Sequence, residues 1–127
     1  MQTLFVAGLL LLVGCVAQSA NAQGCASDSL EVAGAGKLLY RGKGVCASCH
    51  GEQGKGDGDP QYVSLMNPKP SDLTNDAGLK YRTNEARYAA IYDGIPKTAM
   101  PAYRGQLTEA EIKLIIEYLE LLHTRQC

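Results

Sequence analysis

One segment of the chain combines residue types and a spacing that are specific for a single chemistry, Cys46-Ala47-Ser48-Cys49-His50. Two thiols at this spacing can bond to both vinyl groups of a haem, and the histidine that follows can ligate the iron from one side. The alternatives are a thioredoxin-like redox motif and half of a zinc site. Both fail, because no second pair of cysteines or histidines follows and no βαβ pattern surrounds the motif. The segment therefore predicts covalent attachment of one haem c through Cys46 and Cys49, with His50 as an iron ligand.

A methionine further along the chain is the best candidate for the second axial ligand. A thioether is a soft ligand that suits haem iron, and a methionine opposite a histidine raises the reduction potential. Met100 lies fifty residues after His50 in a loop bounded by prolines, far enough along to return on the opposite face of a haem. Met66 instead lies directly before a proline-rich segment. Met100 is therefore predicted as the distal ligand, with His123 or an open position as the alternatives.

The first 22 residues have the features of an export signal. Residues 4–17 are apolar and uncharged, a run shorter than the roughly 20 residues that span a bilayer. Ala20-Asn21-Ala22 matches the A-x-A pattern that signal peptidase recognises. These features predict a signal peptide over residues 1–22 and a mature mono-haem domain over residues 23–127, exported to the periplasm.

A second interpretation of the same segment predicts a lipid anchor. Leu12-Val13-Gly14-Cys15 resembles a bacterial lipobox, in which the signal ends at residue 14 and Cys15 carries the lipid. The protein would then be tethered to a membrane. Without that lipid, no membrane contact is expected.

Two of the five cysteines remain once the haem motif and Cys15 are set aside. These are Cys25 and Cys127, near the two ends of the mature chain. An exported protein folds where disulfides can form, and closing a loop of about a hundred residues would stabilise the fold by roughly 4 kcal/mol. We therefore predict a disulfide between Cys25 and Cys127.

Two segments of the mature chain carry the start and stop signals of helices. The first helix begins at Asp28, whose carboxylate can accept from free amides of the first turn, and ends near residues 42–44. The second runs over residues 84–92 and stops before Gly94, since glycine is the usual residue just past a helix end.

The last helix has the clearest signals. Thr108 and Glu111 form a capping box, and Leu107 with Ile112 forms a hydrophobic staple around it. Apolar residues then recur at helical spacing, so more than half of the circumference is predicted to be buried. The available partners are the haem and the first helix, whose small central residues favour a close crossing. Such a crossing would bring the two terminal cysteines towards each other.

Two loops flank the haem motif in the sequence. Residues 51–60 are too rich in glycine for regular structure, and they complete neither a Walker phosphate loop nor a calcium loop. We interpret them as a surface turn whose glycines let the backbone approach the haem edge. Residues 67–73 hold two prolines that force an extended path. One of their carbonyls is predicted to accept the second ring proton of His50.

The charge pattern excludes one class of partner. The formal net charge is -1, and no basic stripe or interleaving of aromatic and basic residues is present. Nucleic-acid binding therefore has no electrostatic support.

With these motifs in this order, the chain resembles the class I c-type cytochromes over about residues 30–123. It is similar in particular to small exported bacterial cytochromes and to haem c domains of bacterial terminal oxidase subunits, in which a Met-Pro pair follows the distal loop. The resemblance implies an all-α fold of three to five helices around one haem, with His50 and Met100 as axial ligands. It rests on these segments: Cys46–His50, Gly54–Gly58, Pro68–Leu73, Gly94–Tyr103 and Leu114–Leu119.

These features predict an electron carrier of a periplasmic or respiratory chain, not an enzyme, that passes one electron between redox protein partners. The alternatives are an electron-entry subunit of an oxidase or dehydrogenase, and a haem protein that binds a gas or peroxide at an open sixth position. Lys43, Lys97 and Arg104 are predicted to line a docking rim.

Overall fold

The computed structural model describes residues 22–75 and 83–124, with side chains from residue 31 onwards. These residues contain no β-strand, which confirms the predicted all-α fold. No helix within the described ranges is long and apolar enough to cross a membrane. The described residues form five helices: α1 (Ala22–Arg41), α2 (Ala47–His50), α3 (Pro60–Val63), α4 (Asn84–Asp93) and α5 (Glu109–Thr124).

Several sequence-based predictions concern parts of the chain that lie outside this description. Cys15 and Cys127 are outside the described residues, and Cys25 lies in α1 without a described side chain. The signal peptide over residues 1–22, the lipid anchor and the disulfide between Cys25 and Cys127 therefore stay predictions.

The first helix starts earlier than the sequence predicted. α1 begins at Ala22, so Asp28 lies in the helix interior and is not its N-terminal cap. Residues 22–27 hold no proline and include two alanines and a glutamine, which are good helix formers, so the helix runs through them despite Gly24. The predicted end near residues 42–44 agrees with the structure, in which α1 ends at Arg41.

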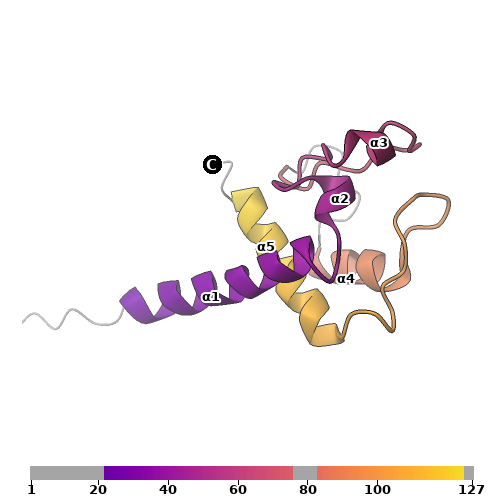
Figure 1. Ribbon diagram of the computed structural model, residues 1–127. Helices are drawn as coiled ribbons and strands as arrows, with labels where there is room; N and C mark the ends of the chain where they lie inside the picture. The colour runs from indigo at the N-terminus through magenta and orange to yellow at the C-terminus, as the bar shows by residue number, and fades with distance from the viewer. Residues whose placement is uncertain (1–21, 76–82, 125–127) are drawn as a thin grey trace, which may run out of the picture.

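The two longest helices, α1 and α5, cross each other, as predicted (Figure 1). The crossing is close because Gly36 of α1 has no side chain. A Cβ atom there would overlap the carbonyl oxygen of Leu114 and would lie 2.8 Å from Cβ of Tyr118 on α5. Tyr118 in turn packs edge to face on Tyr40 of α1, with ring centroids 5.3 Å apart. The C-terminal half of α1 is thereby fixed on the middle of α5.

The core is built mainly from α5, whose buried residues confirm the predicted apolar stripe. Ile112 and Ile115 are fully buried, as is Tyr40 of α1. Leu107, the other member of the predicted hydrophobic staple, is also buried just before the helix. The buried side chains of α5 are Ile112, Ile115, Ile116, Tyr118, Leu119 and Leu122.

The fourth helix is capped at both ends, by Gly94 as the sequence indicated and by Thr83, which the sequence analysis did not name. The side chain of Thr83 accepts a 3.2 Å hydrogen bond from the amide of Ala86 and so satisfies one free donor of the first turn. α4 ends at Asp93, one residue later than predicted, and Gly94 follows with φ of 72°. Ala90 and Ile91 are buried, and α4 packs against α5.

The short helix α3 was not predicted. Residues up to Pro60 were interpreted as a loop, yet Asp59 caps α3 by accepting a 2.9 Å hydrogen bond from the amide of Gln61. Pro60 occupies the first helical position, where its missing N–H costs nothing. An Asp-Pro pair is therefore the signal that identifies this helix.

Candidate functional site

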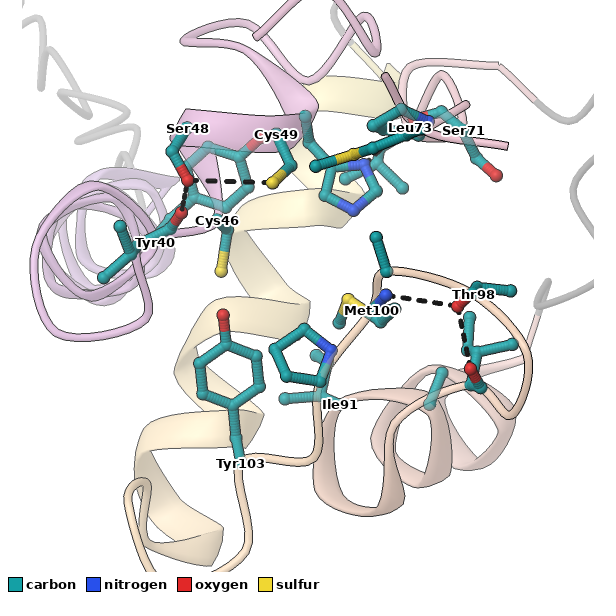
Figure 2. A pocket seen from close by; sticks show the side chains of 18 of the residues that line it. Tyr40, Cys46, Ser48, Cys49, Ser71, Leu73, Ile91, Thr98, Met100 and Tyr103 are labelled. Atoms are coloured by element: carbon teal, nitrogen blue, oxygen red, sulfur yellow. Dashed lines mark hydrogen bonds between the residues drawn. The ribbon is translucent and has the colours of Figure 1, made fainter. Parts of the chain in front are cut away.

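A cavity of about 330 Å³ lies between the haem motif and the Met100 loop, residues 95–102 (Figure 2). This volume falls within the roughly 300–1,000 Å³ that is typical of ligand and cofactor sites. All four residues predicted to bind the haem, Cys46, Cys49, His50 and Met100, line it. Its walls come from α2, the proline segment (residues 67–73), α4, the Met100 loop and α5. The structure thus brings together residues that are far apart in the sequence.

The haem motif forms one wall of this cavity. The amide of Cys46 donates a 2.9 Å hydrogen bond to the carbonyl of Tyr40, so the residue before α2 is bonded to the last turn of α1. In Figure 2 the sulfur atoms of Cys46 and Cys49 point into the cavity, and both cysteines are free. Burial raises the pKa of the Cys46 thiol to about 11, so the thiol is uncharged at neutral pH.

The glycine-rich loop holds α2 in place. The amides of Gly56, Gly58 and Asp59 donate to the carbonyls of His50, Cys49 and Ser48 at 2.8, 3.2 and 2.8 Å. These are carbonyls of the short helix that have no partner within it. A Cβ atom at residue 58 would lie 2.6 Å from the carbonyl carbon of Cys49. The glycines therefore let the loop backbone approach the haem motif itself, a role that the interpretation as a surface turn missed.

The ring of His50 is oriented by the proline segment. Its Nδ1 lies 3.0 Å from the carbonyl oxygen of Ser71. A carbonyl oxygen can only accept, so Nδ1 carries the proton and Nε2 keeps its lone pair. This confirms the prediction that a carbonyl of residues 67–73 accepts from His50. Burial lowers the pKa of His50, while the bond to Ser71 opposes that shift. The neutral imidazole with Nε2 free is the form that binds iron.

The Met100 loop forms the facing wall. In Figure 2, Met100 lies across the cavity from Ser71 and Leu73. The hydroxyl of Thr98 accepts a 3.1 Å hydrogen bond from the amide of Met100 and donates a 2.8 Å bond to the carbonyl of Ile95. The amide of Ile95 closes the loop with a 3.2 Å bond to the carbonyl of Met100. These hydrogen bonds therefore fix the loop backbone that carries the Met100 side chain.

The same loop is fastened to the end of α4. The amides of Tyr103 and Arg104 donate to the carbonyls of Ile91 and Tyr92 at 3.0 and 3.1 Å. Gly94 makes the return possible, because a Cβ atom there would lie 2.8 Å from the amide nitrogen of Ala102. Helix and loop therefore position Met100 as one unit.

The alternative ligands differ in their positions. His123, one of the predicted alternatives, does not line the cavity, and it lies partly buried near the end of α5. Met66 does line the cavity, which the sequence did not indicate. It comes from the segment that leads into the proline wall, so an experiment on the distal ligand must include it.

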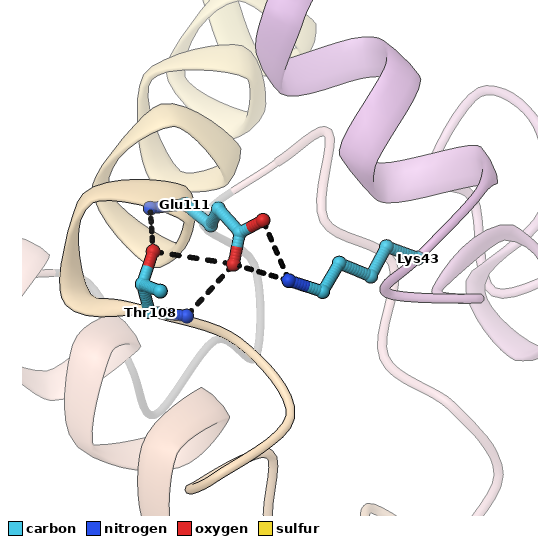
Figure 3. Close-up of polar contacts among 3 residues, drawn as sticks. All are labelled: Lys43, Thr108 and Glu111. Carbon is cyan, nitrogen blue, oxygen red and sulfur yellow. Dashed lines mark hydrogen bonds and ion pairs between the residues drawn. The ribbon is translucent and has the colours of Figure 1, made fainter.

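Two of the three residues predicted for the docking rim are engaged in ion pairs. Lys43 bonds both carboxylate oxygens of Glu111 at 2.7 and 2.8 Å (Figure 3). Glu111 also accepts a 2.8 Å bond from the amide of Thr108, whose hydroxyl accepts a 3.2 Å bond from the amide of Glu111, which confirms the capping box. Arg104 pairs with Asp93 at 2.9 Å, whereas Lys97 is exposed in the Met100 loop.

Sequence reasoning missed two tyrosines in the cavity. The buried hydroxyl of Tyr40 donates a 2.8 Å hydrogen bond to the carbonyl of Gly51, just after the haem motif. Burial raises the pKa of Tyr40 well above its usual range and that of Tyr103 to about 12, so both hydroxyls stay protonated. The position of Tyr40 on the buried face of α1 was readable, but the identity of its acceptor depends on the tertiary fold.

The residues present fit a haem. The cavity offers two thiols, a neutral imidazole and a thioether within walls that are mostly apolar, including Leu73, Ile91 and Leu119. Soft sulfur and imidazole ligands in an apolar environment match the requirements of haem iron. The charged side chains of Lys69 and Arg87 also line the cavity.

Comparison with known proteins agrees with this geometry. The sequence matches the cytochrome c family, described as "Cytochrome c", over residues 33–123, and the chain therefore belongs to this family. Membership implies a covalently bound haem c and electron transfer through it. None of the curated proteins compared matches the chain.

A solved structure is also similar. It is a chain of the Kuenenia stuttgartiensis reducing HAO-like protein complex Kustc0457/Kustc0458, with 28% sequence identity and a TM-score of 0.63. The match covers 72% of this chain and 44% of that chain, so this protein corresponds to less than half of its structural neighbour.

Proposed function

We propose that this protein is an exported electron carrier whose haem c is attached through Cys46 and Cys49, with His50 and Met100 as axial ligands. One observation carries the proposal. A neutral imidazole and a thioether line the same apolar cavity from two separate segments, and hydrogen bonds fix both segments. When bound, the haem supplies an iron that gains or loses one electron.

The chain's own residues provide what such a carrier requires. Ser71 holds the proton of His50 on Nδ1, so that Nε2 is available as a ligand without a change of tautomer. The bonds of Thr98 keep the Met100 loop in one conformation. Leu73, Ile91 and Leu119 give the cavity apolar walls that disfavour water. Such walls also disfavour the ferric haem, which carries one positive charge more than the ferrous haem, and so favour a high reduction potential.

Substitution of Met100 tests the ligand set. In M100A, the ferric protein is expected to lose the weak red charge-transfer band of an iron–thioether bond, and the ferrous protein to bind carbon monoxide rapidly. M66A is the matched control, because Met66 lines the same cavity. It should keep the band and exclude carbon monoxide.

The outcomes separate the three candidate ligand states. Loss of the band in M66A instead of M100A would assign the distal position to Met66. A wild-type ferrous protein that binds carbon monoxide rapidly would support a gas-binding haem protein with an open position. An intact mass equal to that of bare protein, after maturation with working haem-ligation machinery, would overturn the proposal.

A second candidate function is an electron-entry subunit of a larger enzyme. It is supported by the similarity to a chain of a protein complex, of which this protein matches less than half. Co-purification of a partner at high salt would favour it, whereas a free monomer would favour the mobile carrier. Redox protein partners are expected in both cases.

Export and the state of the remaining cysteines are tested together by intact mass spectrometry. A chain that begins at Gln23 would support cleavage of residues 1–22, whereas a lipid on Cys15 would support membrane attachment in the periplasm. A further loss of two hydrogen masses without reductant would support the disulfide between Cys25 and Cys127.

A further inference from the structure

The residue directly before the haem motif has an unfavourable backbone conformation. Val45 has a φ of 50°, which lies in the left-handed region. Glycine adopts this region readily, but it is unusual for a β-branched residue, whose two methyl groups crowd the backbone there. In the described part of the chain, the other non-glycine residue with positive φ is Lys97, which is unbranched at Cβ. Val45 therefore carries a backbone strain that glycine would not.

The connection between α1 and α2 holds glycines, yet the strained position is a valine. Gly42 and Gly44 lie just before Val45, and neither has positive φ. Hydrogen bonds hold the conformation of Val45. Its amide donates to the carbonyl of Gly42 at 3.0 Å, and its carbonyl accepts from the amide and the hydroxyl of Ser48 at 3.2 and 2.6 Å. Strain that the surrounding structure fixes in this way is concentrated at functional sites, so the valine side chain itself requires an explanation.

The side chain of Val45 lies at the mouth of the cavity. Val45 lines the cavity and is 54% exposed, so it faces both the cavity and the solvent. It directly precedes Cys46, a predicted attachment point whose amide is bonded to the carbonyl of Tyr40 in the last turn of α1. An apolar side chain at this position keeps water from the edge of the cavity beside Cys46.

We propose that Val45 is a shielding residue: its strained backbone holds an apolar side chain at the mouth of the cavity, where it keeps water from the edge of the bound haem. The inference rests on the proposed function. Water at this edge stabilises the more highly charged ferric haem, so loss of the apolar side chain lowers the reduction potential. Release of the backbone strain has the opposite sign for folding, because it stabilises the native state. V45G should therefore lower the potential without lowering stability.

The experiment is a redox titration of the haem-loaded full chain, with chemical denaturation of the same samples. V45T keeps the branched shape of the side chain but replaces a methyl group by a hydroxyl that binds water. V45T and V45G should each lower the ratio of ferrous to ferric protein at fixed potential by about twofold or more, which is about 18 mV for a one-electron couple. V45I, which stays apolar and branched, should keep the wild-type ratio.

V63T is the matched control, because it makes the same exchange at a partly buried valine that does not line the cavity. It should leave the ratio unchanged. Denaturation reports the strain. The folding equilibrium constant of V45G should be no lower than that of wild type, because the released strain offsets the contacts that a half-exposed side chain loses.

A ratio that stays at the wild-type value in V45G and V45T overturns the proposal, because the side chain would then not shield the haem. A lower ratio in only one of these two variants also overturns it, since the cause would be the freed backbone or the added hydroxyl instead of the lost apolar cover. So does a folding constant of V45G below that of wild type, which would mean that the backbone is not strained. Since all variants are compared by their haem c spectra, a colourless wild type would instead reject the proposed function.

Discussion

Glu111 connects the start of α5 to the loop that precedes the haem motif. Its carboxylate accepts from Lys43 and from the amide of Thr108 (Figure 3). These hydrogen bonds, that from Lys43 first, hold the pKa of Glu111 below its ordinary value of 4.5. One side chain thus completes the cap of a helix and an ion pair between segments 68 positions apart in the sequence.

This linkage predicts a pH dependence of stability. Because the pKa of Glu111 is lower in the folded protein than in the unfolded chain, its contribution is present above about pH 4.5 and is lost as the pH falls through the folded value. The difference in free energy of unfolding between wild type and E111Q should therefore be larger at pH 7 than at pH 3. Urea denaturation at the two pH values measures it. K43Q should show a weaker form of the same dependence, and equal differences for E111Q at both values would contradict the assignment.

Individual residues were predictable from the sequence where local chemistry determines them. Capping pairs such as Thr108 and Glu111 act within one turn, so their spacing is sufficient evidence. For the hydrogen-bond acceptor of His50, only the segment that contains it was predictable. Which carbonyl accepts depends on how the proline segment folds back, and it is that of Ser71. Arg87 carries no local signal, since its burial depends on the distant walls of the cavity.

At the scale of elements, the crossing of α1 and α5 depends on which of two nearby glycines faces the partner. Gly36 lies in the contact, whereas a Cβ atom at Gly34 would meet nothing within 4 Å. Alanine is favoured over glycine in a helix by about 1 kcal/mol. The same substitution therefore has opposite consequences at two positions of one helix.

We predict that G34A raises the free energy of unfolding by up to about 1 kcal/mol. G36A should lower it by roughly 1–3 kcal/mol or more, because the new methyl group overlaps the backbone of Leu114 and forces the helices apart. Chemical denaturation of the two single variants measures both effects. Destabilisation by G34A equal to that by G36A would mean that the helices do not cross at Gly36.

The elements differ in how far the sequence determined them. α4 was predicted within one residue at both ends, and the start of α5 was predicted directly after Thr108, because local signals mark these positions. The start of α1 was wrong because the cap-like Asp28 sits in a segment that is helical without it. The short helix α3 was missed because one turn has no periodicity, which leaves only its Asp-Pro start as a signal.

At the scale of the whole molecule, two parts of the structure are held together in different ways. α1 and α4 each pack on α5 through buried side chains such as Tyr40, Ile91 and Ile115. α2 and the glycine-rich loop are joined mainly by backbone hydrogen bonds. The cavity separates them from the Met100 loop. Sequence patterns identified the helices, but a cavity assembled from segments far apart in the sequence follows only from the tertiary fold.

This difference predicts which segments become less stable when the haem is lost. C46A/C49A removes both attachment points. Without the haem, the apolar surface of the cavity walls that a bound haem would cover is exposed to water. Amide hydrogen exchange should become at least tenfold faster in residues 46–59 and 95–102, whose structure depends on the cavity. It should change least in residues 112–122, which are held by the contact between α1 and α5.

Exchange followed by mass spectrometry of peptides, with the haem-loaded wild type in the same buffer, measures this difference. A selective increase would mean that the haem organises the two loops on a helical framework that forms without it. An equal increase across all peptides would show that the framework itself requires the haem, and that α1, α4 and α5 do not form a stable unit on their own.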